Sequence, residues 1–150
     1  MKTMQCCHKD ADMYESYTRQ SLPSKEYREL LGTAICVFNS NNAFIIENIL
    51  MCDNNESWYK LMDKTCMPLQ EKIKNIIFKD SNNKIYDQFK KICEMRNRIV
   101  HSFQCTYKNE QILATKDKQN KQFYITKEYL LDFIKKNEQL SDILHNFRGF

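Results

Sequence analysis

The residues of this sequence that are best suited to chemistry are an arginine and a histidine within residues 96–101, which read Arg-Asn-Arg-Ile-Val-His. Helical spacing from the apolar residues before it assigns Arg96 to the apolar face of a helix. A guanidinium on that face needs an anionic partner, a phosphate or a water-filled cleft, because burying it unpaired is expensive. Asn97 and His101 are four residues apart, so their side chains share a neighbouring face one turn apart. His101 also lies near the predicted end of the helix, where the helix dipole favours a cation.

An arginine and a histidine at one cleft are a minimal set of groups for cleaving RNA without a metal ion. A histidine can accept the proton of a ribose 2′-hydroxyl or protonate the leaving 5′-oxygen. An arginine can hold the phosphate and neutralise the charge that develops on it. One histidine cannot easily be both base and acid in one step. A dimer that places two such motifs face to face would supply the second histidine.

The pattern Arg96-Asn97-x-x-x-His101, in the last third of a helical chain, resembles the signature of the HEPN superfamily, in which an Arg is followed a few residues later by a His. Members of that superfamily are compact helical domains that usually dimerise, so that two motifs build one composite site. Many are metal-independent endoribonucleases of toxin–antitoxin, abortive-infection and CRISPR systems. The resemblance therefore implies an endoribonuclease that acts on RNA as a homodimer, as a toxin or phage-defence effector, with an antitoxin or regulatory protein as a further partner.

The resemblance also assigns roles to individual residues. It makes Arg96 and His101 catalytic and Asn97 a supporting polar residue. Glu47 is carried over as a second supporting residue, because acidic side chains on an earlier helix sometimes pair with the motif arginine. The sequence departs from the HEPN pattern at one position that concerns regulation by an antitoxin. Where HEPN toxins are paired with a nucleotidyltransferase antitoxin, a modifiable Tyr often stands two residues after the His, and here that position is Phe103.

The sequence leaves two alternatives to catalysis open. In one, the chain is a non-catalytic HEPN-like domain that binds a nucleotide, an RNA or a protein partner. In the other, Arg96 pairs with a core carboxylate such as Glu47, and His101 caps the helix by bonding a carbonyl. Arg98 needs no special role, because an ion pair with Glu94 four residues before it would account for it. Trp58 and the many Phe and Tyr residues follow helical spacing and are interpreted as mostly core, with no stacking platform for single-stranded RNA.

The seven cysteines give no metal-site pattern. They are odd in number and scattered, without a Cys-x-x-Cys pair, which is typical of reduced thiols in a cytoplasmic protein. Cys6-Cys7-His8 is interpreted as exposed thiols, because a closed zinc site requires four ligands. We therefore expect no metal and no cofactor. Residues 1–21 lack the apolar run of a signal peptide and a Glu and an Asn break the apolar cluster at 44–51, so no membrane-spanning segment is expected.

The fold that must position these residues follows from composition and periodicity. Two Gly and two Pro in 150 residues are too few for the many turns of an all-β fold. The prediction is one all-α domain over residues 1–150, an HEPN-like bundle of about five helices with a small β-hairpin before the last helix and an N-terminal extension at 1–21. Without a Gly-rich loop, phosphate chemistry depends on side chains that project from a helix. Basic side chains are concentrated in the second half of the chain, which permits an anionic partner such as RNA.

Apolar periodicity and capping residues place the individual elements. The predicted elements are one continuous helix over 24–52, a shorter helix over 57–67, a helix that begins at Pro68, a helix over 83–102 that carries the motif, hairpin strands at 111–115 and 122–126, and a last helix that begins after Thr126. Ser24 and Thr126 are the expected N-caps of the first and last helices.

Overall fold

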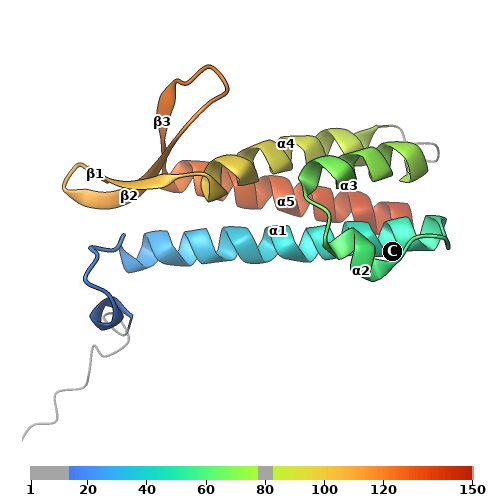
Figure 1. The fold of residues 1–150 in the computed structure, drawn as a ribbon, viewed down its shortest axis with the longest axis horizontal. Coiled ribbons are helices and arrows are strands. Elements are labelled where there is room, and N and C mark those ends of the chain that lie inside the picture. The colour runs from blue at the N-terminus through green and yellow to red at the C-terminus, as the bar shows by residue number, and fades with distance from the viewer. Residues whose placement is uncertain (1–13, 78–82, 150) are drawn as a thin grey trace, which may run out of the picture.

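The structure is a computed structural model that describes residues 14–77 and 83–149. Three long helices, α1, α4 and α5, lie side by side, with α4 antiparallel to the other two, and a small β-sheet lies at one end of them (Figure 1). The elements in chain order are η1 (Glu15–Tyr17), α1 (Lys25–Cys52), α2 (Trp58–Met62), α3 (Cys66–Lys72), η2 (Ile73–Ile77), α4 (Lys84–Val100), β1 (Phe103–Tyr107), β2 (Glu110–Lys116), β3 (Gln122–Ile125) and α5 (Lys127–Arg148).

Helix α1 is a single helix of 28 residues, which confirms the continuous helix predicted there. Ser24 caps it, because its Oγ accepts a hydrogen bond from the Tyr27 N–H at 3.2 Å. The Asn-rich stretch in its middle is held by a buried polar contact with α5. Asn41 Nδ2 donates to the Asn137 carbonyl at 2.7 Å and to Asn137 Oδ1 at 3.1 Å. The side chains that disfavour this helix in isolation therefore join it to α5.

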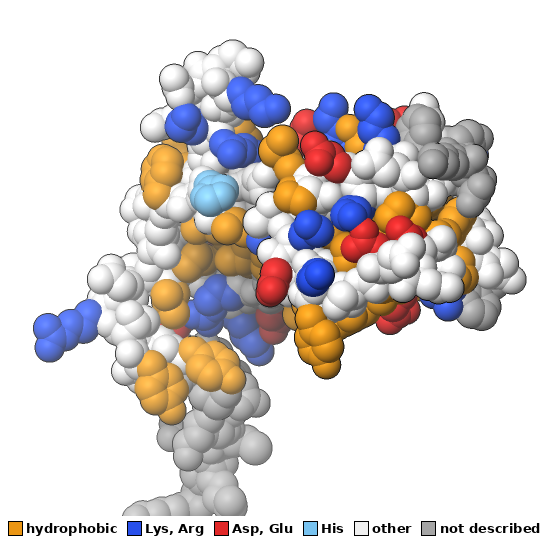
Figure 2. All heavy atoms as spheres, turned by 45° about the vertical axis from the view of Figure 1, so that its right-hand side comes forward, with side chains coloured by type: hydrophobic (Ala, Val, Ile, Leu, Met, Phe, Trp, Pro, Cys, Tyr) orange, Lys and Arg blue, Asp and Glu red, His pale blue; other side chains and the backbone are white. Residues whose placement is uncertain are grey.

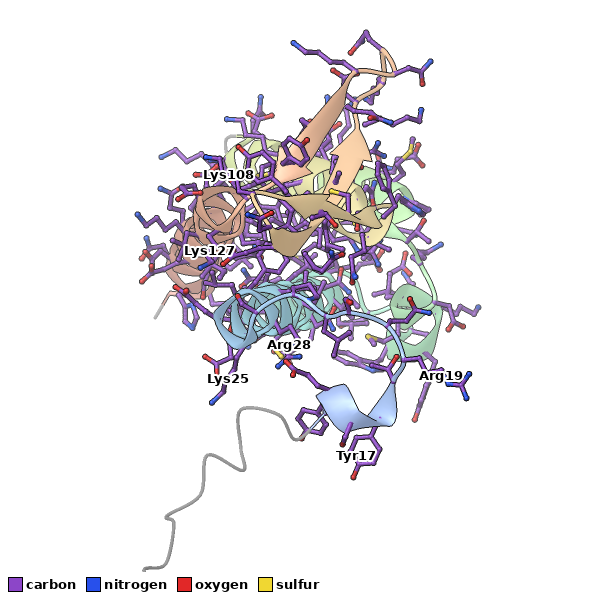
Figure 3. The ribbon with its side chains drawn as sticks, turned by 90° about the vertical axis from the view of Figure 1, so that its left-hand side faces the viewer. Tyr17, Arg19, Lys25, Arg28, Lys108 and Lys127 are labelled. Atoms are coloured by element: carbon purple, nitrogen blue, oxygen red, sulfur yellow. The ribbon has the colours of Figure 1, made fainter. Side chains whose placement is uncertain are left out.

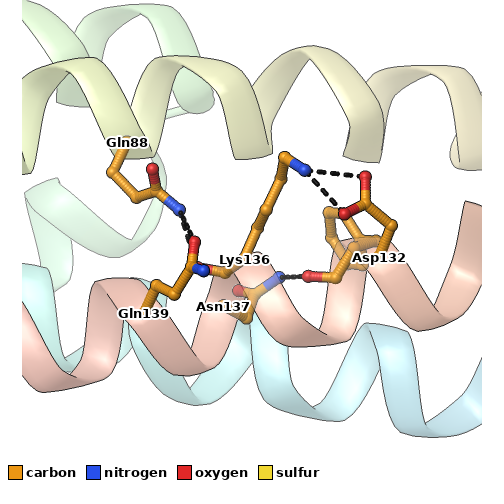
Figure 4. A network of polar contacts seen from close by, with 6 residues as sticks. Gln88, Asp132, Lys136, Asn137 and Gln139 are labelled. Atoms are coloured by element: carbon orange, nitrogen blue, oxygen red, sulfur yellow. Dashed lines mark hydrogen bonds and ion pairs between the residues drawn. The ribbon is translucent and has the colours of Figure 1, made fainter.

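Helices α4 and α5 share a second set of polar contacts (Figure 4). Gln88 on α4 donates to the Lys136 carbonyl at 3.0 Å and to Gln139 Oε1 at 3.2 Å. Lys136 also forms an ion pair with Asp132, one turn earlier on α5, at 2.7 Å. Thr126 caps α5 as predicted, because its Oγ1 accepts a hydrogen bond from a backbone N–H of the first turn at 3.1 Å.

An aromatic stack at the centre of the core fixes how the three long helices face one another. Phe38 of α1 lies with its ring centroid 6.4 Å from that of Phe89 on α4 and 6.2 Å from that of Phe133 on α5. All three rings are buried. Each helix thus supplies one ring, and the face of α4 that contains Phe89 is turned toward α1 and α5.

The prediction of an all-α fold is wrong, because three strands form an antiparallel sheet in the order β1-β2-β3. The predicted hairpin is its β2–β3 half, and β1 is the strand that the prediction missed. Lys108 and Asn109 connect β1 to β2 with φ of 49° and 62°. A two-residue turn with both residues in the left-handed region makes a tight hairpin, and here it forms without glycine. The scarcity of glycine therefore did not exclude a third strand.

The short helices between α1 and α4 differ from their predicted bounds. The helix predicted over 57–67 is only α2, Trp58–Met62. α3 begins at Cys66, two residues before Pro68, and continues as a wider turn over Ile73–Ile77. Proline is tolerated here because the first N–H groups of a helix have no partner inside the helix. The part of residues 1–21 that the structure describes carries the short helical turn η1.

Among the described residues, α1 is the one helix long and apolar enough to cross a membrane. This is weak evidence, because the core helix of a soluble protein has the same length and composition. α1 contributes eight buried residues to the contacts with its neighbours. That no segment spans a membrane stays a prediction from the sequence.

Candidate functional site

The last turns of α4 position the arginine of the motif at the inner side of the helix. Arg96 is half-buried, and its guanidinium carbon lies 5.6 Å from the ring centroid of Phe38 on α1. Its Nη1 donates to Asn97 Oδ1 at 3.3 Å. Within residues 14–77 and 83–149, no carboxylate lies close enough to Arg96 to form an ion pair. An aromatic face and an amide oxygen therefore hold this cation, and its remaining N–H groups can take an anion.

Two buried thiols lie near this guanidinium, and sequence reasoning gave them no role. A hydrogen bond with Cys93 lowers the pKa of the Cys66 thiol, against the effect of burial, and the charge of Arg96 lowers it further. The same hydrogen bond, together with burial, raises the pKa of Cys93. Cys66 begins α3 and Cys93 lies on α4, so these two thiols join α3 to α4. The positive charge of Arg96 acts on both thiols.

His101 is the exposed residue at the end of α4, and its main chain is held on both sides. Its N–H donates to the Asn97 carbonyl at 2.9 Å, and its own carbonyl accepts from Thr115 Oγ1 on β2, also at 2.9 Å. The imidazole forms no hydrogen bond with any residue that the structure describes. The helix is therefore capped through the main chain of His101. The non-catalytic alternative, in which the ring of His101 caps the helix by bonding a carbonyl, is not what the structure has. A fixed backbone with an exposed ring suits a group that exchanges protons with a ligand.

Asn97 connects the inner arginine to a cavity of about 460 Å³. Besides bonding Arg96, it lines this cavity together with Arg98, while Arg96 and His101 are not among the lining residues. The remaining lining residues come from α3, α4 and the β2–β3 region: Met67, Gln70, Lys90, Cys93, Glu94, Asp117, Lys118, Gln119 and Phe123. The structure thus places Asn97 beside Arg96, and it leaves His101 on the outer surface next to the sheet.

Arg98 has a different partner from the one that its sequence neighbourhood indicates. Its Nη1 donates to the carbonyl of Lys116 at the end of β2, and no ion pair with Glu94 forms. Its charge also acts on Tyr129 of α5, where burial raises the pKa to about 12 and Arg98 opposes that rise. Arg98 therefore joins α4 to the sheet and to α5.

Glu47 is not brought to the arginine of the motif. It is an exposed residue of α1, and its Oε2 lies 3.9 Å from Nη1 of Arg148 near the end of α5. The Arg148 guanidinium also lies 5.7 Å from the ring centroid of Phe44. The expected support of Arg96 by Glu47 is absent from the described geometry, and Asn97 and Phe38 take that place.

The part of the chain that the structure describes contains no group of three or more His, Cys, Asp or Glu side chains that could hold a metal ion. Cys6-Cys7-His8 lies outside the described residues. Among the described residues, the cysteines at 36, 52, 66, 93 and 105 form no disulfide.

Exposed aromatic side chains on the sheet are a feature that the sequence analysis missed. Phe103 and Tyr124 are 49% and 45% exposed, and Tyr107 contacts Tyr124 with a ring-centroid distance of 4.2 Å. Tyr124 lies in the strand predicted at 122–126, whereas Phe103 and Tyr107 lie on β1, which was not predicted. Only the pairing of the strands shows that Phe103 and Tyr124, 21 residues apart in the chain, share one face.

The chain matches no protein-family model, no curated protein and no solved structure. The likeness to the HEPN superfamily therefore rests on the motif and its position in the chain.

Proposed function

We propose that this chain is a metal-independent endoribonuclease of HEPN type that acts as a homodimer, with Arg96 and His101 as its catalytic residues. One observation carries the proposal. A half-buried arginine without a carboxylate partner among the described residues lies five residues before an exposed histidine whose main chain is held on both sides. A structural arginine would be expected to have an anionic partner, and a structural histidine a bonded ring.

The chemistry needs a base, an acid and a group that stabilises the charged phosphate. The imidazole of His101 accepts the proton of a ribose 2′-hydroxyl, whose oxygen then attacks the adjacent phosphorus. The bond from phosphorus to the 5′-oxygen breaks, and that oxygen takes a proton from the imidazolium of the second copy. The products are a 2′,3′-cyclic phosphate and a 5′-hydroxyl.

Arg96 stabilises the negative charge that develops on the phosphate during this transfer. One of its donors is used by Asn97, which leaves four of its five N–H groups outside that bond. Asn97 fixes the plane of the guanidinium and is a positioning residue. The pairing with Phe38 leaves the full positive charge of Arg96 uncompensated, which favours a dianionic transition state.

The proposal is tested with purified protein and bulk RNA in EDTA, beside Arg96→Ala and His101→Ala. Each substitution is expected to reduce cleavage at least 100-fold, because general acid–base catalysis and charge stabilisation each contribute on that order. His145→Ala is the matched control, since His145 is an exposed histidine on α5 and should leave cleavage unchanged. Thermal unfolding of each variant checks that it folds.

Two results would refute the proposed site. One is the absence of cleavage by the folded parent protein, and the other is cleavage that survives both substitutions. Mass spectrometry of the products gives an independent check, because ends other than a 2′,3′-cyclic phosphate and a 5′-hydroxyl would require a different nucleophile.

A further inference from the structure

The exposed aromatic residues on the sheet frame a hollow immediately after His101. Phe103 on β1 pairs with Ala114 on β2, and Ala114 pairs with Tyr124 on β3. Directly paired residues of neighbouring strands have their side chains on the same face of a sheet. Two aromatic rings therefore flank the small, buried side chain of Ala114, and these residues line a hollow of about 210 Å³.

The spacing of the strands gives this hollow the width of a planar ring. Neighbouring strands lie about 4.8 Å apart, so the backbones of Phe103 and Tyr124 are separated by about 10 Å. A base stacked between two rings contacts one ring on each side, and the centroids of stacked aromatic rings lie about 4.5–7 Å apart. The methyl group of Ala114 leaves this space open, and a larger side chain there would fill it. The Tyr124 ring also packs on Tyr107 of β1, with a ring-centroid distance of 4.2 Å.

The charge around the sheet suits the phosphates of a nucleic acid. Residues 103–125 contain four lysines and two acidic residues. Lys108 lies with Nζ 5.2 Å from the ring centroid of Tyr107. Of the two acids, Asp117 is engaged within the β2–β3 turn, where its Oδ1 accepts from the N–H groups of Gln119 and Lys121 at 2.9 Å. Figure 2 shows hydrophobic side chains at the surface of this part of the molecule, beside a histidine and near a group of basic side chains.

A second basic region, where α1 and α5 begin, is less suited to anions. Lys25, Arg28 and Lys127 lie on that face with Lys108 (Figure 3). The first three form ion pairs with Glu29, Glu15 and Glu26, at 3.7, 3.2 and 2.6 Å. Their charges are balanced locally, whereas Lys108 rests on an aromatic ring.

We propose that the hollow between Phe103 and Tyr124 binds an unpaired base of single-stranded RNA, with the lysines of the two turns along the phosphate backbone. Aromatic side chains on a sheet recognise single strands because the bases are free to stack on them. This inference rests on the proposed function, which makes RNA the substrate. His101 precedes Phe103 by two residues, and its carbonyl is bonded to Thr115, whose side chain lies on the opposite face of β2 from Ala114. A base stacked on Phe103 is therefore bound at the strand that directly follows α4.

The test measures the binding of a fluorescently labelled, single-stranded oligoribonucleotide by anisotropy. The protein carries His101→Ala and the buffer contains EDTA, so that cleavage does not consume the probe. Phe103→Leu and Tyr124→Leu are each expected to raise Kd about 5- to 150-fold, the range for losing one base–aromatic stack. Phe103→Trp keeps an aromatic ring and should retain tight binding. Tyr59→Leu is the matched control, because Tyr59 on α2 is 81% exposed and should leave Kd unchanged.

The same oligonucleotide in a duplex should bind more weakly, because its bases are already stacked and paired. The inference is overturned if the single strand does not bind, if both leucine variants bind it as tightly as the parent, or if the duplex binds equally well. It is also overturned if the leucine variants change the sedimentation of the protein without changing Kd, since the face would then be a contact between copies. Binding of the single strand without cleavage by the unsubstituted chain would refute the proposed function alone. Cleavage by the unsubstituted chain, together with unaltered binding by the leucine variants, would refute only the proposed binding of a base in the hollow.

Discussion

Tyr27 is the side chain through which α1 holds the sheet, and its hydroxyl offers a direct test of this arrangement. It is buried, and it donates to the Ile125 carbonyl at 2.6 Å while accepting from the Leu113 N–H at 3.1 Å. Leu113 and Ile125 are register partners on β2 and β3. One hydroxyl thus bridges a donor and an acceptor of adjacent strands, and we expect Tyr27→Phe to weaken the docking of the sheet on α1.

The expected loss of stability follows from what the substitution removes. Phenylalanine keeps the buried ring, so the hydrophobic contribution of the side chain is unchanged. The Leu113 N–H and the Ile125 carbonyl each lose a partner, and a buried polar group left unsatisfied costs about 1–3 kcal/mol. With partial relaxation of the strands, the free energy of unfolding should fall by about 2–4 kcal/mol. At about 2–4 °C per kcal/mol for a chain of this size, Tm should fall by about 4–16 °C.

The assay is urea unfolding followed by circular dichroism, with Tyr59→Phe as the matched control. Tyr59 is 81% exposed, so removing its hydroxyl should change stability by less than about 0.5 kcal/mol. The midpoint of Tyr27→Phe should fall without a change in the slope m, because the folded surface is unaltered. A loss below about 0.5 kcal/mol for Tyr27→Phe would refute the prediction, because it would show that the docking of the strands does not depend on this hydroxyl.

Two further predictions concern the contacts of α5. Burial raises the pKa of Tyr129 to about 12, so the unfolded chain ionises this group first as pH rises above about 10. The native state then holds more protons than the unfolded state, and stability should decline between pH 10 and 12, by less in Tyr129→Phe than in the parent. Asn137→Leu should lower the free energy of unfolding by about 1–3 kcal/mol, because the buried Asn41 amide loses its side-chain partner and keeps only the main-chain carbonyl of residue 137. Adding Asn41→Leu should recover part of that loss, and urea midpoints of the single and double variants will show whether it does.

The helices could be predicted because their signals are local. α1 and α5 have periodic apolar positions and Ser24 and Thr126 at their N-caps, and these contacts span three residues. The half-buried position of Arg96 was also predicted, because helical periodicity alone assigns a residue to a face. Local periodicity does not say what lies opposite that face, so the ring of Phe38 could not be foreseen.

The sheet and the partners of the charged residues could not be predicted because they depend on contacts between distant parts of the chain. β1 was missed since its turn, Lys108-Asn109, takes left-handed φ values without the glycine that usually signals them. Arg98 bonds a carbonyl 18 residues away, and Glu47 pairs with Arg148 across two helices. Helical spacing indicated Glu94 as the partner of Arg98, and the resemblance to the HEPN superfamily indicated Arg96 as the partner of Glu47.

The sheet that contradicts the all-α prediction is also the element that fixes His101. The last residues of a helix have unsatisfied carbonyl groups and fray easily. Here the carbonyl of His101 accepts from Thr115 on the central strand, and Arg98, one turn earlier, bonds the carbonyl of Lys116 on the same strand. Two bonds to β2 therefore hold the last turn of α4, and β2 is held in turn by Tyr27 on α1. A substitution at Tyr27 that moves β2 should therefore also move the imidazole of His101. The orientation of the sheet is thus part of the proposed site.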